Sequence, residues 1–404
     1  MQRRSFNSQR RTKSFSNSSY HGGGRPRNRG KRPENTIERS RFIQKAAPIA
    51  EAVVVPPAHQ FSDFGFAEKL QENLSAKGYV TPTPIQDQSM KPLMEGKDVI
   101  GLASTGTGKS AAFLLPILHQ QLDNKVANGA LIITPTRELA HQVSDEFRSF
   151  ARGLGLFSVV CVGGENIHRQ KQELRRGVQV VIGTPGRLKD LIQQGELKLQ
   201  QVKTLVLDEA DHMLDMGFLP DVRFIMNVLP ENRQVVCFSA TMTKDVSRLL
   251  QGIQDNAVQI STTPVVTSEH IDQDIIAANT KEEKIGHLLE LLENAEYKKV
   301  LVFGQTKHGV QRLADTLEKS GHKTQAIHGN KTQSQRQRAL KAFKDSDHAV
   351  LVATDVAARG LDIPNVHLVV NFDQPQTYDT YVHRIGRTGR AGKGGSARTF
   401  VPHK

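Results

Sequence analysis

The 404-residue sequence contains no tryptophan, two cysteines, and no apolar run near the roughly 20 residues that a membrane span requires. Cys161 and Cys237 each lie in an apolar, strand-like run, which predicts buried free thiols. Two such cysteines form neither a disulfide framework nor a metal site, which fits a reducing compartment. The N-terminus is polar and lacks the apolar core of a secretory signal. A membrane protein and a disulfide-stapled secreted domain are thereby excluded, and a cytoplasmic location is expected.

The excess positive charge is concentrated at one end of the chain. The formal net charge is +13, and residues 1–45 supply +11 of it, from thirteen Lys and Arg against Glu34 and Glu38. The rest of the chain is close to neutral, so any site there for an anionic partner must be a local patch. Residues 1–55 are rich in Arg, Ser, Asn and Gly, which predicts a disordered basic tail. The tail is either a solvated, solubilising segment or a flexible arm for nucleic acid, with aromatic rings that could stack on bases at Phe6, Phe15 and Tyr20.

From Phe61 onward, short apolar runs alternate with amphipathic helical stretches. Several runs are nearly continuous in Val, Ile and Leu, as in strands that are buried on both faces, which indicates parallel sheets. The runs form two series, separated by an aperiodic stretch: 98–103, 130–135, 178–185, 204–211 and 234–241, then 299–306, 323–329, 349–355, 367–373 and 396–401. The sequence therefore predicts an α/β fold of two tandem domains, each a mainly parallel sheet flanked by helices. The predicted organisation is a tail at 1–55, a first domain at 56–262, a linker at 263–271 and a second domain at 272–404.

The strongest local motif is ASTGTGKS, at residues 103–110, which follows a predicted strand and precedes a predicted helix. Glycines allow the backbone to wrap closely around phosphate, with its N–H groups pointing inward. Lys109 would reach the outer phosphates of a nucleotide, and the Ser110 hydroxyl would bind Mg²⁺. Ala103 stands where the usual phosphate loop has its first glycine. The motif predicts ATP and Mg²⁺ as ligands, with contacts from Ser104, Thr105, Gly106, Thr107, Gly108, Lys109 and Ser110.

A second motif, TLVLDEAD at 204–211, ends an apolar strand in acidic residues. Beside a phosphate loop, Asp208 would supply a second contact to Mg²⁺, and Glu209 would orient or deprotonate the attacking water. A solvated acidic turn is the alternative if the motif is taken alone.

Together these motifs resemble the DEAD-box ATP-dependent RNA helicases. The phosphate loop, DEAD at 208–211, SAT at 239–241 and HRIGRTGR at 383–390 occur in that family's order and spacing. The chain looks most like the short bacterial members with a minimal helicase core. The resemblance implies two RecA-like domains that bind ATP and single-stranded RNA between them. It also implies an RNA-stimulated ATPase that locally separates short RNA duplexes or remodels RNA–protein complexes.

The resemblance further implies individual nucleotide contacts. Residues 78–86 are similar to the family's adenine-reading segment, in which Gln86 would bond the adenine edge and Tyr79 would stack on its face. Arg387 and Arg390 would be arginine fingers on the γ-phosphate, whereas Arg384 would make a structural or interdomain pair. The remaining implied ATP contacts are Phe61, Thr81, Gly360 and Asp362.

Contacts to the RNA backbone are implied at strand ends in both domains. The residues concerned are Pro135, Thr136, Arg137, Gly164, Thr184, Pro185, Arg187 and Asp190 in the first domain, and Thr306, Gln335, Arg338 and Thr354 in the second. A polar outer helix face is the alternative for Gln335 and Arg338. Ser239 and Thr241 would bond Asp211 and His383 and thereby couple hydrolysis to strand separation, although a structural histidine is equally compatible with His383.

Two other functions use similar motifs. An ATP-gated RNA clamp or annealing chaperone would need the same residues. A DNA-directed motor of the related two-domain superfamily fits less well, because of the adenine segment and the DEAD–SAT pair. A monomer is expected, and ribonucleoprotein or degradation complexes are the candidate protein partners. The sequence does not select among RNAs of ribosome assembly, mRNA decay or cold adaptation.

Overall fold

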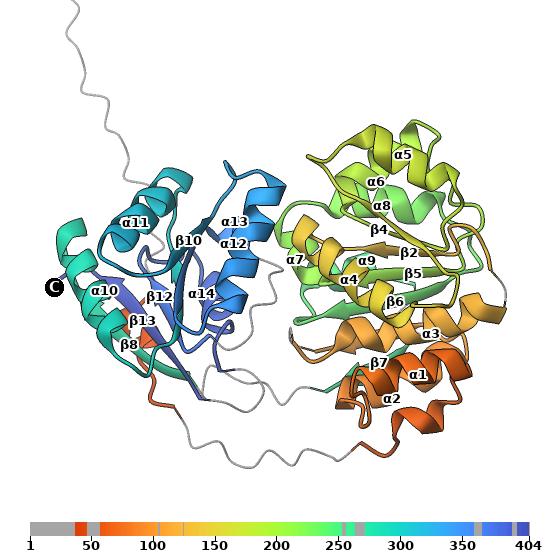
Figure 1. Ribbon diagram of the computed structural model, residues 1–404, viewed down its shortest axis with the longest axis horizontal. Helices are drawn as coiled ribbons and strands as arrows, with labels where there is room; N and C mark the ends of the chain where they lie inside the picture. Colours follow the sequence, from red (N-terminus) through yellow and green to blue (C-terminus); the bar gives the residue numbers. More distant parts are fainter. Residues whose placement is uncertain are drawn as a thin grey trace, which may run out of the picture. The chain divides into compact units, whose positions relative to one another are not determined.

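The computed structural model describes residues 37–46, 57–103, 106–123, 125–252, 256–262, 271–358, 366–389 and 394–403. Within these ranges the strands form one sheet of seven strands and one of six. All pairs between the named strands are parallel. Figure 1 shows each sheet with helices against it. The predicted α/β architecture of two mainly parallel sheets is confirmed.

The first sheet has the strand order β3-β4-β2-β5-β6-β1-β7. Its strands are β1 (Val99–Leu102), β2 (Ala130–Ile133), β3 (Ser158–Cys161), β4 (Val180–Gly183), β5 (Thr204–Asp208), β6 (Gln234–Ser239) and β7 (Val258–Ser261). Alternate residues of a strand point to opposite faces, and they enter two separate cores. Val206 packs in one core, and its neighbours Leu205 and Leu207 pack in the other. This burial on both faces explains the continuous apolar runs.

Helices cover both faces of this sheet. One core is completed by side chains of α1 (Glu68–Ala76), α2 (Pro84–Met94), α3 (Lys109–Asp123) and α4 (Arg137–Phe150). The other is completed by α5 (Ile167–Arg175), α6 (Pro185–Gln193), α7 (Ala210–Asp215), α8 (Leu219–Val228) and α9 (Lys244–Leu249). A short 3₁₀ helix, η2 (Phe61–Phe64), precedes α1.

The second sheet has the strand order β10-β11-β9-β12-β13-β8. Its strands are β8 (Ile271–Ala277), β9 (Lys299–Phe303), β10 (Thr324–Ile327), β11 (Ala349–Ala353), β12 (Leu368–Asn371) and β13 (Gly395–Val401). Its helices are α10 (Lys281–Glu293), α11 (Lys307–Lys319), α12 (Gln333–Asp345), α13 (Asp355–Ala358) and α14 (Tyr378–Ile385). The expected apolar face of α11 is buried, at Val310, Leu313, Ala314 and Leu317.

Each strand predicted from an apolar run is present, but β7 and β8 were not predicted as strands. Both lie at an edge of their sheet, where fewer residues are buried. Ile271, which the prediction placed in the linker, begins β8 and pairs with Gly395. Residues 263–270, the rest of the predicted linker, lie outside the described residues.

The predicted disordered tail at 1–55 is wrong over residues 37–46. A 3₁₀ helix, η1 (Arg39–Phe42), forms there, and the Phe42 side chain is buried. Gln44 forms an antiparallel bridge with Gln273 of β8. A single aromatic ring packs into an apolar site on the second domain. The basic composition of the segment gives no indication of this contact. Residues 1–36 and 47–55 lie outside the described residues.

Both cysteines are free and buried, as predicted, and burial raises the pKa of Cys161 to about 12. No helix in the described part of the chain has the length and apolarity to cross a membrane.

Candidate functional site

The predicted site residues of the first domain follow the carboxyl ends of parallel strands. Lys109 follows β1, Thr136 follows β2, Thr184 follows β4, and Asp208 ends β5. Parallel strands place these ends along one edge of the sheet, which is where ligands bind in open α/β folds. The topology therefore gathers motifs that are about a hundred residues apart in the chain.

The phosphate loop wraps tightly between β1 and α3. Gly106 and Gly108 both have a φ of 85°, a left-handed conformation that favours glycine. A Cβ on Gly108 would lie 2.4 Å from the Gln86 side-chain nitrogen. The Lys109 side chain is buried, and its ammonium donates to the Ala103 carbonyl at 3.1 Å. The loop is thus compact, with its lysine turned back over it.

Gln86 ties the predicted adenine segment to this loop. Its amide nitrogen donates to the Gly108 carbonyl at 2.9 Å, and its amide oxygen accepts from the Thr83 N–H at 2.8 Å. The Thr83 hydroxyl donates to the Thr107 carbonyl at 2.8 Å. A second amide hydrogen and a second oxygen lone pair of Gln86 leave capacity for the donor–acceptor edge of adenine.

The Tyr79 ring has a packing role in this structure. It meets the rings of Phe61 and Phe150 edge to face, each at 5.5 Å between centroids. Burial is the main cause that raises the pKa of Tyr79 to about 12, and the neighbouring Glu146 adds to it. Phe61 is buried beside it, whereas Thr81 is exposed. Tyr79 is therefore part of an aromatic cluster that packs the segment against the first domain.

Asp208 is the residue best suited to a metal ion. Its side chain is buried, and its Oδ1 atom has no hydrogen-bond partner. Burial raises its pKa to about 7, Lys109 acts in the opposite direction, and Glu209 adds to the rise. An unsatisfied buried carboxylate oxygen beside a phosphate loop fits Mg²⁺. Within the described residues no group of three or more His, Cys, Asp or Glu could hold a metal, so such an ion would share its coordination with phosphates and water.

Glu209 is held in a conformation that a glutamate seldom adopts. Its φ is 54°, and its carboxylate bonds the His212 ring at 2.9 Å. Burial opposes ionisation, but the hydrogen bond and charge of His212, with Lys109 and Arg387, lower the pKa of Glu209 to about 2. Glu209 is therefore ionised and oriented, as a base must be. His212 was not predicted as a site residue. Its spacing of three residues from Glu209, which lets the two side chains meet on a helix, could have indicated the contact.

The predicted link between the DEAD and SAT motifs is present. The Thr241 hydroxyl and N–H bond Asp211 Oδ2 at 3.0 and 2.9 Å. The Ser239 hydroxyl accepts from the Asp211 N–H at 3.3 Å and donates to the Thr241 carbonyl at 2.8 Å. No hydrogen bond from either residue to His383 is seen among the described contacts. His383 instead meets the His212 ring edge to face at 4.9 Å, and burial lowers its pKa.

The three arginines of HRIGRTGR differ in position. Arg384 makes the expected structural pair, with its guanidinium on both oxygens of Asp355, on Asn371 and on the Asp373 carbonyl. Arg387 is buried, and its Nε donates to the His383 carbonyl at 3.4 Å. Arg390 lies outside the described residues, together with Ser104, Thr105, Gly360 and Asp362.

Most of the predicted RNA residues of the first domain line one cavity of about 420 Å³. Thr136 and Thr184 stand at the helix N-termini of α4 and α6. The Arg187 guanidinium bonds Gln170 at 2.7 Å and lies 3.8 Å from Asp190. The predicted residues along this cavity are Pro135, Thr136, Arg137, Thr184, Arg187 and Asp190. The side chains predicted to hold RNA are thus brought together.

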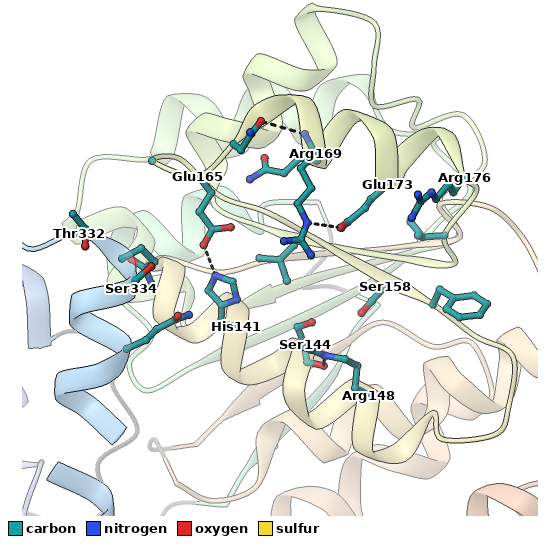
Figure 2. Close-up of a pocket in the computed structure, with 18 of the residues that line it drawn as sticks. His141, Ser144, Arg148, Ser158, Glu165, Arg169, Glu173, Arg176, Thr332 and Ser334 are labelled. Atoms are coloured by element: carbon teal, nitrogen blue, oxygen red, sulfur yellow. Dashed lines mark hydrogen bonds and ion pairs between the residues drawn. The ribbon is translucent and has the colours of Figure 1, made fainter. Parts of the chain in front are cut away.

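Gly164 has a φ of 77°, and a Cβ there would collide with the Arg137 guanidinium, so the glycine lets this arginine lie against the loop. Gly164 also borders a larger cavity of about 840 Å³. Figure 2 shows that charged side chains of this cavity are partly paired, His141 with Glu165 and Arg169 with Glu173. Pro185 is buried at the start of α6.

In the second domain, Thr306 is the N-cap of α11 and Thr354 precedes α13, both at strand ends as expected. The structure does not bring Gln335 and Arg338 to the cavity. The Gln335 side chain bonds the Thr332 N–H and caps its own helix, and Arg338 bonds the Ser334 carbonyl.

Two neighbours of these residues take the inward positions on α12. Gln333 is buried, and Arg336 pairs with the buried Glu138 at 3.0 Å and lines the smaller cavity. None of these three residues was predicted as a contact from the sequence. The signal was present, since Gln333 and Arg336 have the same spacing as the pair that was chosen.

A phosphate loop, a strand-borne Asp–Glu pair and an arginine-lined cavity at the strand ends of a parallel sheet are features of the RecA-like class of nucleotide-binding proteins. The profile of the DEAD/DEAH box helicases matches residues 83–249, and that of the helicase conserved C-terminal domain matches residues 283–392. The chain belongs to the DEAD-box helicase family.

Relatives in this family include RNA helicase CrhR of Synechocystis sp., 43% identical over 327 residues, and CshA of Streptococcus pneumoniae, 45% identical over 346 residues. These matches cover 81% and 85% of this chain but 66% and 65% of those relatives. A solved structure of S. cerevisiae Dbp5 bound to RNA and ADP BeF3 has a TM-score of 0.75 at 32% identity, covering 86% of this chain and 90% of that one. These matches fit the predicted resemblance to short bacterial members with a minimal core.

Proposed function

We propose that this protein is an ATP-dependent RNA helicase that hydrolyses ATP on single-stranded RNA and locally separates short duplexes. The proposal rests on one observation: the predicted nucleotide residues and the predicted RNA residues lie along the same edge of the first sheet. The Asp208–Glu209 pair and Lys109 lie at the same strand ends as the cavity lined by Arg137 and Arg187. Nucleotide and RNA would therefore bind side by side on one rigid scaffold. The solved relative bound to RNA and ADP BeF3 supports the same ligand pair.

In this proposal the first domain supplies most of the nucleotide site. Lys109 neutralises phosphate charge, Gln86 bonds the adenine edge, and Glu209 orients or deprotonates the attacking water. Mg²⁺ would be held by Asp208 and Ser110 and would polarise the phosphates. Arg387 would stabilise the charge that develops on the γ-phosphate, with Arg390 as the second arginine finger.

RNA would bind through its backbone. Threonine hydroxyls at helix N-termini and two guanidiniums suit phosphate oxygens, and such contacts carry little sequence information. Thr306 and Thr354 would extend the contact into the second domain, and Arg336 would be a further contact beside the residues predicted from the sequence. The Asp211–Thr241 bond would couple hydrolysis to strand separation. The expected monomeric state, cytoplasmic location and ribonucleoprotein or degradation partners stay predictions.

ATP hydrolysis measured with single-stranded RNA and with DNA of the same sequence tests this proposal. We expect RNA to stimulate turnover and DNA not to, because contacts to 2′-hydroxyls separate the two. Glu209→Gln should bind ATP and RNA normally and stop turnover. Glu231→Gln, which changes an exposed glutamate of the same domain, is the matched control. Normal turnover by the Glu209→Gln protein would remove Glu209 from the mechanism. Equal stimulation by DNA would replace the RNA assignment with a DNA-directed motor.

A further inference from the structure

The helix that leads into Arg387 carries an apolar stripe. In α14 the side chains of Tyr378, Tyr381, Val382 and Ile385 recur at i, i+3, i+4 and i+7, which places them on one helix face. Arg384 lies off this stripe and bonds Asp355. The stripe packs into a small cluster with Ile271, Ala397 and Val401 of the sheet. The orientation of α14 therefore depends on what fills this cluster.

Phe42 fills it from a distant part of the sequence. Its side chain is 1% exposed, and its ring lies 4.8 Å from the Tyr381 ring at 68°. Ile37 packs partly against the same cluster. The cluster is thus completed by a segment that lies more than 200 residues before the sheet it joins. No other described residue before β8 belongs to it.

Polar contacts fix this segment on both sides of Phe42. Gln44 and Gln273 exchange backbone hydrogen bonds of 3.0 and 2.7 Å at the edge strand β8. The Arg39 guanidinium donates to the Pro402 carbonyl at 2.8 Å, and the Arg41 guanidinium lies 3.9 Å from the centre of the Tyr378 ring. The Tyr381 hydroxyl donates to the Gln273 side chain at 2.9 Å. The buried ring and the cation–π contact therefore act on α14, and the backbone pairing anchors the same segment to β8.

We propose that residues 37–46 are a positioning element of the second domain and that Phe42 holds α14 in the orientation that presents Arg387. A helix of eight residues is too short to be stable by itself, so packing decides its place. Arg387 follows Ile385 by two residues and moves with the end of the helix. The proposal rests on the proposed function, in which Arg387 acts on the γ-phosphate. Phe42 touches no reacting group and is a positioning residue.

The first test is kinetic and uses the full-length protein. Phe42→Ala should lower RNA-stimulated kcat by about tenfold, because a displacement near 1 Å can cost up to about a hundredfold. The KM for ATP should stay within about twofold of wild type, since an arginine finger acts chiefly in the transition state. Ile43→Ala removes a neighbouring side chain that is 50% exposed, and it should change neither constant. Phe42→Leu should restore part of kcat.

Three outcomes separate the hypotheses. A folded Phe42→Ala protein with wild-type kcat overturns the positioning role. If Phe42→Ala does not fold, Phe42→Leu and Phe42→Met decide, and wild-type kcat in both overturns it. A wild-type protein without RNA-stimulated ATPase instead contradicts the proposed function, and the catalytic part of this proposal falls with it.

The second test does not depend on activity. The chain has no tryptophan, so Phe42→Trp introduces a single indole at the proposed anchor. We expect blue-shifted emission and several-fold weaker quenching by acrylamide than in the matched Ile43→Trp protein. Equal quenching in the two proteins would show that the segment does not dock, and would overturn the proposal.

Discussion

Replacing Asp208 with asparagine should stabilise the protein when nucleotide and metal ions are absent. Burial raises the pKa of this carboxyl from 3.8 to about 7, against the opposing charge of Lys109. Below 3.8 the carboxyl is protonated in both the folded and unfolded chain, so its pKa shift has no effect on stability. As the pH rises from 3.8 to 7, the unfolded chain loses the proton first, and the folded state is progressively destabilised. Above 7 the penalty is complete.

The magnitude follows from the size of the shift. Each pKa unit corresponds to 1.36 kcal/mol, so the carboxylate costs about 2 kcal/mol at pH 5 and about 4 kcal/mol at pH 8, as upper bounds. The amide of Asp208→Asn carries no charge and avoids this penalty. In a domain of this size 1 kcal/mol changes Tm by roughly 2–4 °C, so the gain at pH 8 should be roughly 10 °C.

Differential scanning calorimetry in EDTA at pH 5 and pH 8 measures this effect. The gain of Asp208→Asn over wild type should be larger at pH 8, and its ATPase should be lost. Asp145→Asn changes a carboxylate on α4 that is 71% exposed and should shift Tm little at either pH. A Tm at pH 8 equal to or below that of wild type would refute the reasoning, as would a gain that is the same at both pH values.

Three further predictions concern ligand contacts. Lys109→Ala should abolish ATP binding, seen as no change in a fluorescent-nucleotide titration, because a charged hydrogen-bond donor to phosphate is removed. Arg187→Ala should reduce the salt dependence of RNA binding by about 0.7 in log–log slope, the effect of one phosphate contact on a single strand. Arg223→Ala, on the exposed side of α8, should leave that slope unchanged. Thr241→Val should lower duplex unwinding about tenfold more than RNA-stimulated ATPase, because the Asp211 bond is lost; equal losses in both assays would contradict a coupling role.

The sequence is sufficient to predict a structural element where the signal is local. The phosphate loop is one such case, because strand, glycines, lysine and helix are contiguous and each obeys its own rule. The strand β8 is the opposite case. Its residues alternate between buried Ile271 and Gln273 and partly exposed Asp272 and Asp274, as an edge strand allows. Without a continuous apolar run, it could not be told from a linker.

In α12 the sequence left open which glutamine and arginine face the cavity. Gln333–Arg336 and Gln335–Arg338 have identical spacing, so the motif alone does not select between them. The cap selects. Thr332 is the N-cap, which makes Gln335 the third helical residue, and its side chain returns to the Thr332 N–H. A glutamine used in this way cannot also reach the cavity.

The burial of Phe42 could not be predicted for a different reason, which is the composition of the tail. Thirteen basic residues in 1–45 predict disorder when the segment is averaged. One ring can nevertheless dock if its partners already exist, and those partners, Tyr381 and Ile385, lie more than 300 residues away in the chain. A non-local apolar contact of this kind leaves no periodic pattern to detect.

Two adjacent residues at the carboxyl end of β5, Asp208 and Glu209, each violate an ordinary rule of stability. Among the described residues, Asn128 and Glu209 are the two non-glycine residues with positive φ, and asparagine tolerates that conformation far better than glutamate. Asp208, directly before Glu209, leaves a buried carboxylate oxygen without a partner. Strain and an unsatisfied charge at adjacent positions destabilise the free protein. A bound cation and phosphate would satisfy that charge, so the cost in the free protein becomes binding energy in the complex. The extra stability expected of Asp208→Asn therefore measures the penalty that bound ligands would relieve in the wild-type protein.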